Sequence, residues 1–126
     1  MSPRARARAA DVAVAAAFAG SAATLFVLGD ERDGSLPFFL AWFAVHVLYG
    51  TVSGSFWALL IVVSCPPLFV AASSGNGDDT PLWLQAFFVE AFYGIPFAFV
   101  GILAHRIWQL RHRELPPQPE GEESAE

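Results

Sequence analysis

The chain has 126 residues, of which 55% are hydrophobic and 15% are charged, and its formal net charge is −5. Soluble domains have about 25% charged residues, so this composition excludes a disordered chain and argues against a water-soluble globular domain. The single cysteine, Cys65, excludes an internal disulfide framework and a cysteine-rich zinc site. The charge pattern also gives no support to nucleic-acid binding, because the apolar regions contain no basic stretch.

The N-terminal part of the chain is a basic segment, residues 1–10, followed by a charge-free run from Val12 to Gly29. About 20 apolar residues, each adding 1.5 Å of helix, cross a hydrocarbon core of about 30 Å. We therefore expect a first transmembrane helix over residues 11–28. The alternative is a signal peptide with a small-residue cleavage site at Ser21-Ala22-Ala23, but the apolar run continues past that site, which favours a retained helix.

The next apolar stretch, residues 36–72, is too long to be one transmembrane helix. As a single helix it would be about 55 Å long, almost twice the thickness of the hydrocarbon core. The small and polar residues from Gly50 to Gly54 are the natural position for a break. We therefore expect spans over 36–52 and 55–72, followed by a fourth span over 82–107.

The distribution of charges predicts how these spans are oriented. Arginines precede the first span and follow the last, whereas the loops near residues 30–33 and 78–79 are acidic. The positive-inside rule places both termini in the cytoplasm, which requires an even number of crossings and hence four spans. We therefore predict a multi-pass protein of the cell membrane, with a transmembrane domain over 11–108 and a disordered cytoplasmic tail over 109–126. The arginines expected to contact lipid headgroups are Arg106, Arg111 and Arg113.

A possible internal repeat relates the two halves of the chain. A shift of 44 residues places the segment 37–50 on the segment 81–94 with six identities in 14 positions, and it carries the first span onto the third without a gap. This pattern predicts an all-α, integral membrane four-helix bundle built from two helical hairpins of the same, parallel orientation. The alternative is that two apolar helices, each preceded by a proline, resemble one another by composition alone.

The same shift aligns His46 with Glu90, the two strongly ionisable residues deep in the apolar spans. Each lies nine residues beyond its proline, which is about 13 Å along a helix and close to the middle of the bilayer. Helices pack about 8–10 Å apart, so the imidazole and the carboxyl group can meet directly or through a water. Three roles are open for this polar pair: a structural clasp between helices, a proton relay, or cofactor ligation and catalysis.

Small residues follow each member of the polar pair at helical spacing. The expected helix-packing residues are Gly50 and Gly54 after His46, and Gly94 and Ala98 after Glu90. Residues four apart share a helix face, and small side chains there let backbones approach closely. Tyr49 and Tyr93 are expected to add one hydroxyl group to each face.

Prolines interrupt two of the expected spans. Pro96 is expected to kink the fourth span near its middle. Pro66 and Pro67 lie about two-thirds of the way along the third span and remove two amide donors from it. They indicate either a simple kink or a broken helix at a functional site.

No nucleophile–base pair, phosphate-binding loop or paired carboxylate is present in the sequence, so we predict no catalytic residue, no metal ligand and no cofactor. The expected function is that of a non-enzymatic structural or accessory subunit in the lipid bilayer, as a homo-oligomer or in a larger membrane complex. The alternative is a small oligomeric proton-linked transporter or channel that uses Glu90 and His46. All seven basic residues are arginine, which, with the abundance of alanine, favours a prokaryotic source.

Overall fold

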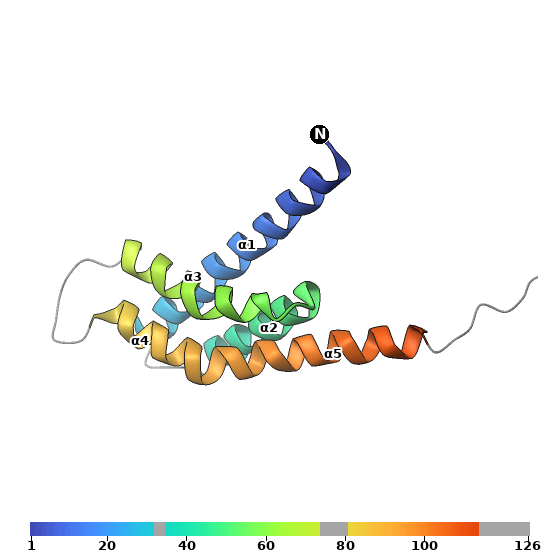
Figure 1. The fold of residues 1–126 in the computed structure, drawn as a ribbon. Helices are drawn as coiled ribbons and strands as arrows, with labels where there is room; N and C mark the ends of the chain where they lie inside the picture. The colour runs from blue at the N-terminus through green and yellow to red at the C-terminus, as the bar shows by residue number, and fades with distance from the viewer. Residues whose placement is uncertain (32–34, 74–80, 114–126) are drawn as a thin grey trace, which may run out of the picture.

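The structure, a computed structural model, describes residues 1–31, 35–73 and 81–113 (Figure 1). These ranges contain helices and no strands. The elements are α1 (Pro3–Glu31), α2 (Leu36–Ser53), α3 (Trp57–Ser73), α4 (Leu82–Val89), the π-helical segment η1 (Glu90–Gly94) and α5 (Ile95–Arg113). The last three follow one another directly as a continuous helix of 32 residues, from Leu82 to Arg113. The described chain is therefore an all-helical bundle of four helices.

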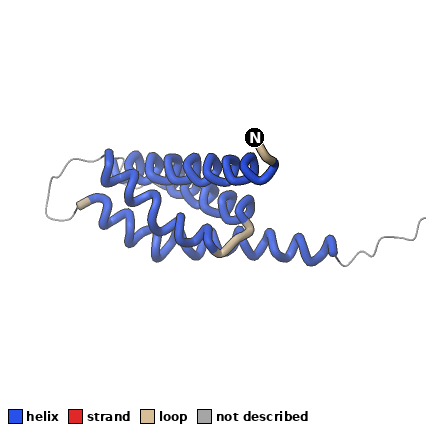
Figure 2. Tube along the Cα trace, turned by 45° about the horizontal axis from the view of Figure 1, so that its top comes forward, coloured by secondary structure: helices blue, strands red, loops and turns tan. Residues whose placement is uncertain are grey.

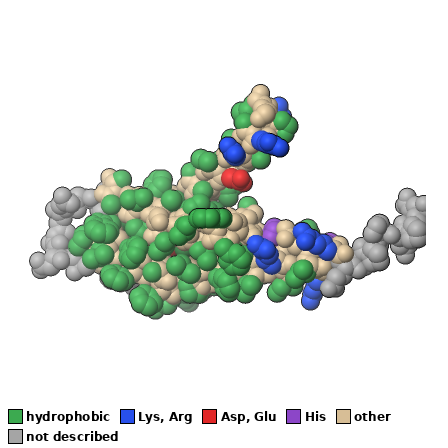
Figure 3. Space-filling model, viewed as in Figure 1, with side chains coloured by type: hydrophobic (Ala, Val, Ile, Leu, Met, Phe, Trp, Pro, Cys, Tyr) green, Lys and Arg blue, Asp and Glu red, His purple; other side chains and the backbone are tan. Residues whose placement is uncertain are grey.

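Three of the four helices are long and apolar enough to cross a membrane: α1, α2 and the continuous helix Leu82–Arg113. The fourth, α3, is apolar but has 17 residues, which corresponds to about 25 Å. Hydrophobic side chains cover the body of the bundle in Figure 3, including large ones that are more than half exposed. A surface of this kind has no polar face for water, so the helices indicate a membrane protein.

Two helices extend further than their apolar runs predict. Helix α1 begins at Pro3, so most of the basic segment 1–10 forms its first turns, and α5 continues to Arg113, so the first residues of the expected tail 109–126 are helical. Alanine and arginine are strong helix formers, and a helix continues to satisfy its own backbone beyond the hydrocarbon core. The remainder of the tail and the acidic loop near residues 78–79 lie outside the described residues.

The helices alternate in direction along the bundle. In Figures 1 and 2, the N-terminal end of α1, the turn between α2 and α3, and the C-terminal end of α5 all lie on the same side of the molecule. Helix α2 packs mainly along α5 and α1, and α3 packs along α1 and α4. The main core lies between these helices and includes Phe18, Trp42, Val62 and Ile102.

Helices α2 and α5 approach so closely that their backbones are in contact. A Cβ atom added to Gly50 would collide with the carbonyl oxygen of Ala98, and one added to Gly101 would collide with the carbonyl oxygen of Val47. Ala98 itself is completely buried. Close approach of this kind is the usual role of small residues between membrane helices. The prediction did not include Gly101, although it lies seven residues after Gly94 and therefore on the same helix face.

Gly54 ends α2, and it also packs closely against α5, because a Cβ atom added there would collide with the ring of His105. It has a φ of +56°, and its N–H group donates a hydrogen bond to the carbonyl oxygen of Gly50. Glycine is the residue that adopts this left-handed conformation without strain, and it commonly ends helices in this way. The resulting short turn between α2 and α3 lies where the sequence predicts the break.

The prolines have two different effects. Helix α3 is continuous through Pro66 and Pro67, both of which are buried, so a broken helix is not observed there. Before Pro96, the chain forms the π-helical segment η1, in which the N–H group of Ile95 donates to the carbonyl oxygen of Glu90. Proline has no N–H group, and its ring crowds the carbonyl group four residues earlier, so the preceding turn widens. The helix axis changes direction between α4 and α5 in Figure 1.

The backbone contact at Gly50 predicts that Gly50→Ala lowers stability by about 1–3 kcal/mol, because the added methyl group must push α2 and α5 apart. Gly20→Ala is the matched control, since nothing lies within 4 Å of the corresponding position on α1. This control should be neutral or stabilising by up to about 1 kcal/mol, because alanine favours the helix. Thermal unfolding in detergent, followed by circular dichroism, measures both. Equal effects of the two substitutions would contradict the described packing of α2 on α5.

Candidate functional site

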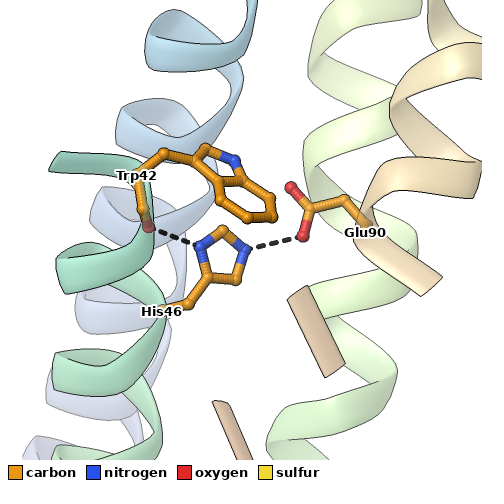
Figure 4. A network of polar contacts seen from close by, with 3 residues as sticks. All are labelled: Trp42, His46 and Glu90. Carbon is orange, nitrogen blue, oxygen red and sulfur yellow. Dashed lines mark hydrogen bonds and ion pairs between the residues drawn. The ribbon is translucent and has the colours of Figure 1, made fainter. Parts of the chain in front are cut away.

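His46 and Glu90 are in direct contact in the centre of the bundle. The Nε2 atom of His46 lies 2.6 Å from the Oε2 atom of Glu90 (Figure 4), and the two side chains are 0% and 1% exposed. His46 lies in α2, and Glu90 is the first residue of η1. The contact therefore joins the second helix to the fourth by a hydrogen bond between two ionisable groups.

The hydrogen bond on the other side of the ring determines how many protons the pair carries. The Nδ1 atom of His46 lies 2.8 Å from the carbonyl oxygen of Trp42. A carbonyl oxygen can only accept, so Nδ1 must carry a proton and donate it. A second proton must then lie between Nε2 and Oε2, because two acceptors cannot hydrogen-bond to each other. The pair is either neutral acid with neutral imidazole, or carboxylate with imidazolium, and its net charge is zero in both forms.

Aromatic rings enclose the imidazole. The centroid of the Trp42 ring system is 4.0 Å from that of His46, and Phe18 of α1 meets the imidazole edge-on at 5.0 Å. Phe18 also stacks on Tyr49 at 4.2 Å. Helices α1 and α2 together therefore hold the ring in one orientation and keep it apart from lipid.

The carboxyl group of Glu90 occupies space that a glycine leaves open. A Cβ atom on Gly94 would collide with the Oε2 atom of Glu90, and it would lie 3.1 Å both from Nε2 of His46 and from a methyl group of Val62. Val62, on α3, is completely buried. Three helices thus meet at the carboxyl group, and the absence of a side chain at Gly94 is a condition for the contact with His46.

Trp42 is a part of the site that the sequence analysis missed. It is 4% exposed, and its indole Nε1 atom has no hydrogen-bond partner among the described residues. Figure 4 shows this nitrogen on the side of the ring that faces the carboxyl group of Glu90. The signal was available, because Trp42 precedes His46 by four residues and therefore lies on the same helix face.

The two tyrosines lie in different environments. Tyr49 is buried with an exposed fraction of 6%, whereas Tyr93 is 54% exposed and lies 6.5 Å from Phe97, measured between ring centroids. The expectation that Tyr93 shares the face of Glu90 is therefore wrong. More residues fit into one π-helical turn than into an α-helical turn, so the third residue after Glu90 does not return to the same face.

The arginines of α5 lie apart from the polar pair, at the end of the bundle that also carries the first turns of α1 (Figure 3). Arg106 lies over the ring of Phe56, with its guanidinium carbon 5.3 Å from the ring centroid. Arg111 and Arg113 are exposed in the last turn of α5. Their positions suit contacts with phosphate groups at a membrane surface.

Comparisons with protein-family models, with curated proteins and with solved structures found no match. Within residues 1–31, 35–73 and 81–113, no three His, Cys, Asp or Glu side chains lie close enough together to hold a metal ion. What the arrangement supplies is one hydrogen-bonded acid–imidazole pair of zero net charge inside an aromatic and glycine-lined enclosure.

Gly94→Ala tests whether this glycine makes room for the carboxyl group. The added methyl group should displace Glu90 from His46 and lower stability by about 1–3 kcal/mol. The same substitution in a Glu90→Ala background should have a smaller effect, because the colliding carboxyl group is gone. Thermal unfolding of the four proteins in one detergent gives both differences. An equal loss in the two backgrounds would contradict the assigned role of Gly94.

Proposed function

We propose that this chain is a non-enzymatic structural or accessory subunit of the cell membrane, whose second and fourth helices are joined inside the bilayer by the contact between His46 and Glu90. The observation that carries the proposal is the complete burial of this pair at a distance of 2.6 Å. An unpaired polar group in hydrocarbon is expensive. The packing in which His46 and Glu90 hydrogen-bond to each other is therefore more stable than packings that leave either side chain unpaired. The pair thus selects one packing of α2 against the fourth helix.

The zero net charge of the pair supports a clasp. A buried pair that binds two protons in either of its forms places no net charge in the bilayer, so it avoids the large penalty of an isolated ion. Loss of one proton would leave a negative charge among Trp42, Phe18 and Val62, which offer no cationic partner. The enclosure therefore favours an interaction that stays formed over one that exchanges protons rapidly.

The positions of the arginines support a topology of four crossings with both termini in the cytoplasm. The basic first turns of α1 and the basic last turns of α5 lie on one side of the molecule (Figure 3). The positive-inside rule assigns that side to the cytoplasm. The partners in this proposal are the lipid bilayer and, through the exposed apolar faces of the helices, further copies of the chain or a larger membrane complex.

A double-mutant cycle tests the clasp. His46→Ala and Glu90→Ala should each lower stability by about 3 kcal/mol, because each leaves a buried partner unpaired. The double variant should lose less than the sum, with a coupling energy of about 1 kcal/mol. Reversible unfolding in mixed micelles measures the four proteins, and Tyr93→Phe, at an exposed position, serves as an unaffected control. Strictly additive losses would remove the basis for the clasp.

A second candidate function, a proton-linked transporter or channel, is favoured by two cavities on either side of the polar pair. Trp42 lines a cavity of about 540 Å³ that also contacts Asp30, and Tyr49 lines a cavity of about 250 Å³ that also contacts Asp11. Trp42 packs directly on His46, and Tyr49 stacks on Phe18, which in turn packs on His46. Protons entering near Asp30 or near Asp11 would therefore approach the pair through these two aromatic residues.

Proton flux into liposomes separates the two candidates. Under a potassium diffusion potential, a transporter should acidify a trapped pH-sensitive dye faster than empty liposomes do, and Glu90→Gln should abolish the difference. Glu31→Gln removes an exposed acidic residue outside the pair and should leave the flux unchanged. Wild-type flux equal to that of empty liposomes would rule out a proton channel through the pair and leave the clasp in place.

A further inference from the structure

Of the two cavities beside the polar pair, the one lined by Trp42 and Asp30 has the dimensions and lining of a ligand site. Its volume is about 540 Å³, and it lies between the end of α1, the beginning of α2 and Val89 of α4. Pockets of about 300–1,000 Å³ are typical for drug-sized ligands. The lining is mainly apolar and includes four aromatic residues: Phe26, Phe38, Phe39 and Trp42. The cavity therefore suits a compact hydrophobic molecule with a large apolar surface.

The charge at the cavity selects the sign of the ligand. Asp30 is the single charged residue in the lining, and it forms no ion pair with another described residue. Aromatic faces also carry negative electrostatic potential and attract cations. Both the carboxylate of Asp30 and the faces of the aromatic rings therefore favour binding of a cation and disfavour binding of an anion.

The inner wall of the cavity is connected to the polar pair. Trp42 lines the cavity, while its carbonyl oxygen accepts the hydrogen bond from His46 and its ring packs on the imidazole. Three other aromatic side chains of the lining come from α1 and α2. A ligand would therefore rest against a wall that the core of the bundle already holds in place, which lowers the entropy lost on binding.

We propose that this cavity binds a hydrophobic organic monocation, of the quaternary phosphonium or ammonium class, with its apolar groups among the aromatic rings and its charge toward Asp30. The proposal does not depend on the proposed function, because the cavity lies beside the His46–Glu90 contact and leaves it intact. An accessory subunit would use the site to bind a lipophilic cation as a ligand. A proton-linked carrier would use it to bind a substrate.

Two ions of the same shape and opposite charge test the proposal. The protein is reconstituted in nanodiscs of zwitterionic lipid, and binding of tetraphenylphosphonium and of tetraphenylborate is measured by flow dialysis, with empty nanodiscs subtracted because both ions partition into lipid. We expect saturable binding of the cation and none of the anion. Equal binding of both ions, or no cation binding above that of empty nanodiscs, would overturn the proposal.

Paired variants assign the binding to this cavity. Asp30→Asn should weaken cation binding about fivefold, whereas Glu31→Gln changes the net charge equally one residue away, outside the lining, and should leave the affinity unchanged. Phe39→Leu keeps an apolar side chain but removes a ring, and should weaken binding about threefold. If Asp30→Asn does not fold, Phe39→Leu still tests whether the cation binds in this cavity. Equal effects of Asp30→Asn and Glu31→Gln, or an unchanged affinity in Phe39→Leu, would contradict the assignment.

Discussion

The packing of the bundle depends on one requirement: two ionisable side chains deep in an apolar interior must satisfy each other. His46 and Glu90 do so at 2.6 Å, with both side chains fully buried. The carbonyl oxygen of Trp42 fixes the proton on the far side of the imidazole. The pair consequently carries zero net charge, which is the form that an apolar environment tolerates. The close packing of α2 against the fourth helix brings these two groups together.

Small residues and a wide helical turn make this contact sterically possible. Gly50 and Gly101 let the backbones of α2 and α5 touch, and Gly94 leaves room for the carboxyl group. The π-helical segment starts at Glu90 itself, and such segments inside α-helices are frequent at functional positions. Pro96 makes a regular α-helical turn unfavourable there. The same proline that interrupts the helix thus helps to place the acid.

The sequence predicts the parts of this arrangement that follow from composition and spacing. Charge-free runs indicate the membrane helices, the excess length of residues 36–72 requires the turn near Gly54, and equal distances from two prolines place His46 and Glu90 at one depth. The structure places these two side chains in contact. The internal repeat and the parallel hairpins stay predictions, because the contact requires matching depth and adjacent helices, and both can arise without a duplication.

The remaining details depend on local backbone geometry, which residue spacing does not determine. Counting α-helical turns predicts Tyr93 on the face of Glu90, whereas the π-helical segment turns it outward to 54% exposure. Gly54 packs against α5 as its spacing predicts, but its positive φ, which ends the helix, does not follow from that spacing. Trp42 resembles an ordinary membrane aromatic residue in the sequence, although its carbonyl oxygen and ring hold His46 in place.

The most direct test of the contact between His46 and Glu90 is a solid-state NMR measurement of the dipolar coupling between ¹⁵N-labelled His46 Nε2 and ¹³C-labelled Glu90 Cδ in lipid bilayers. The account predicts the strong coupling of two groups in direct contact, lost in His46→Gln while His105 and His112 are retained. Absence of coupling in the wild-type protein would contradict it.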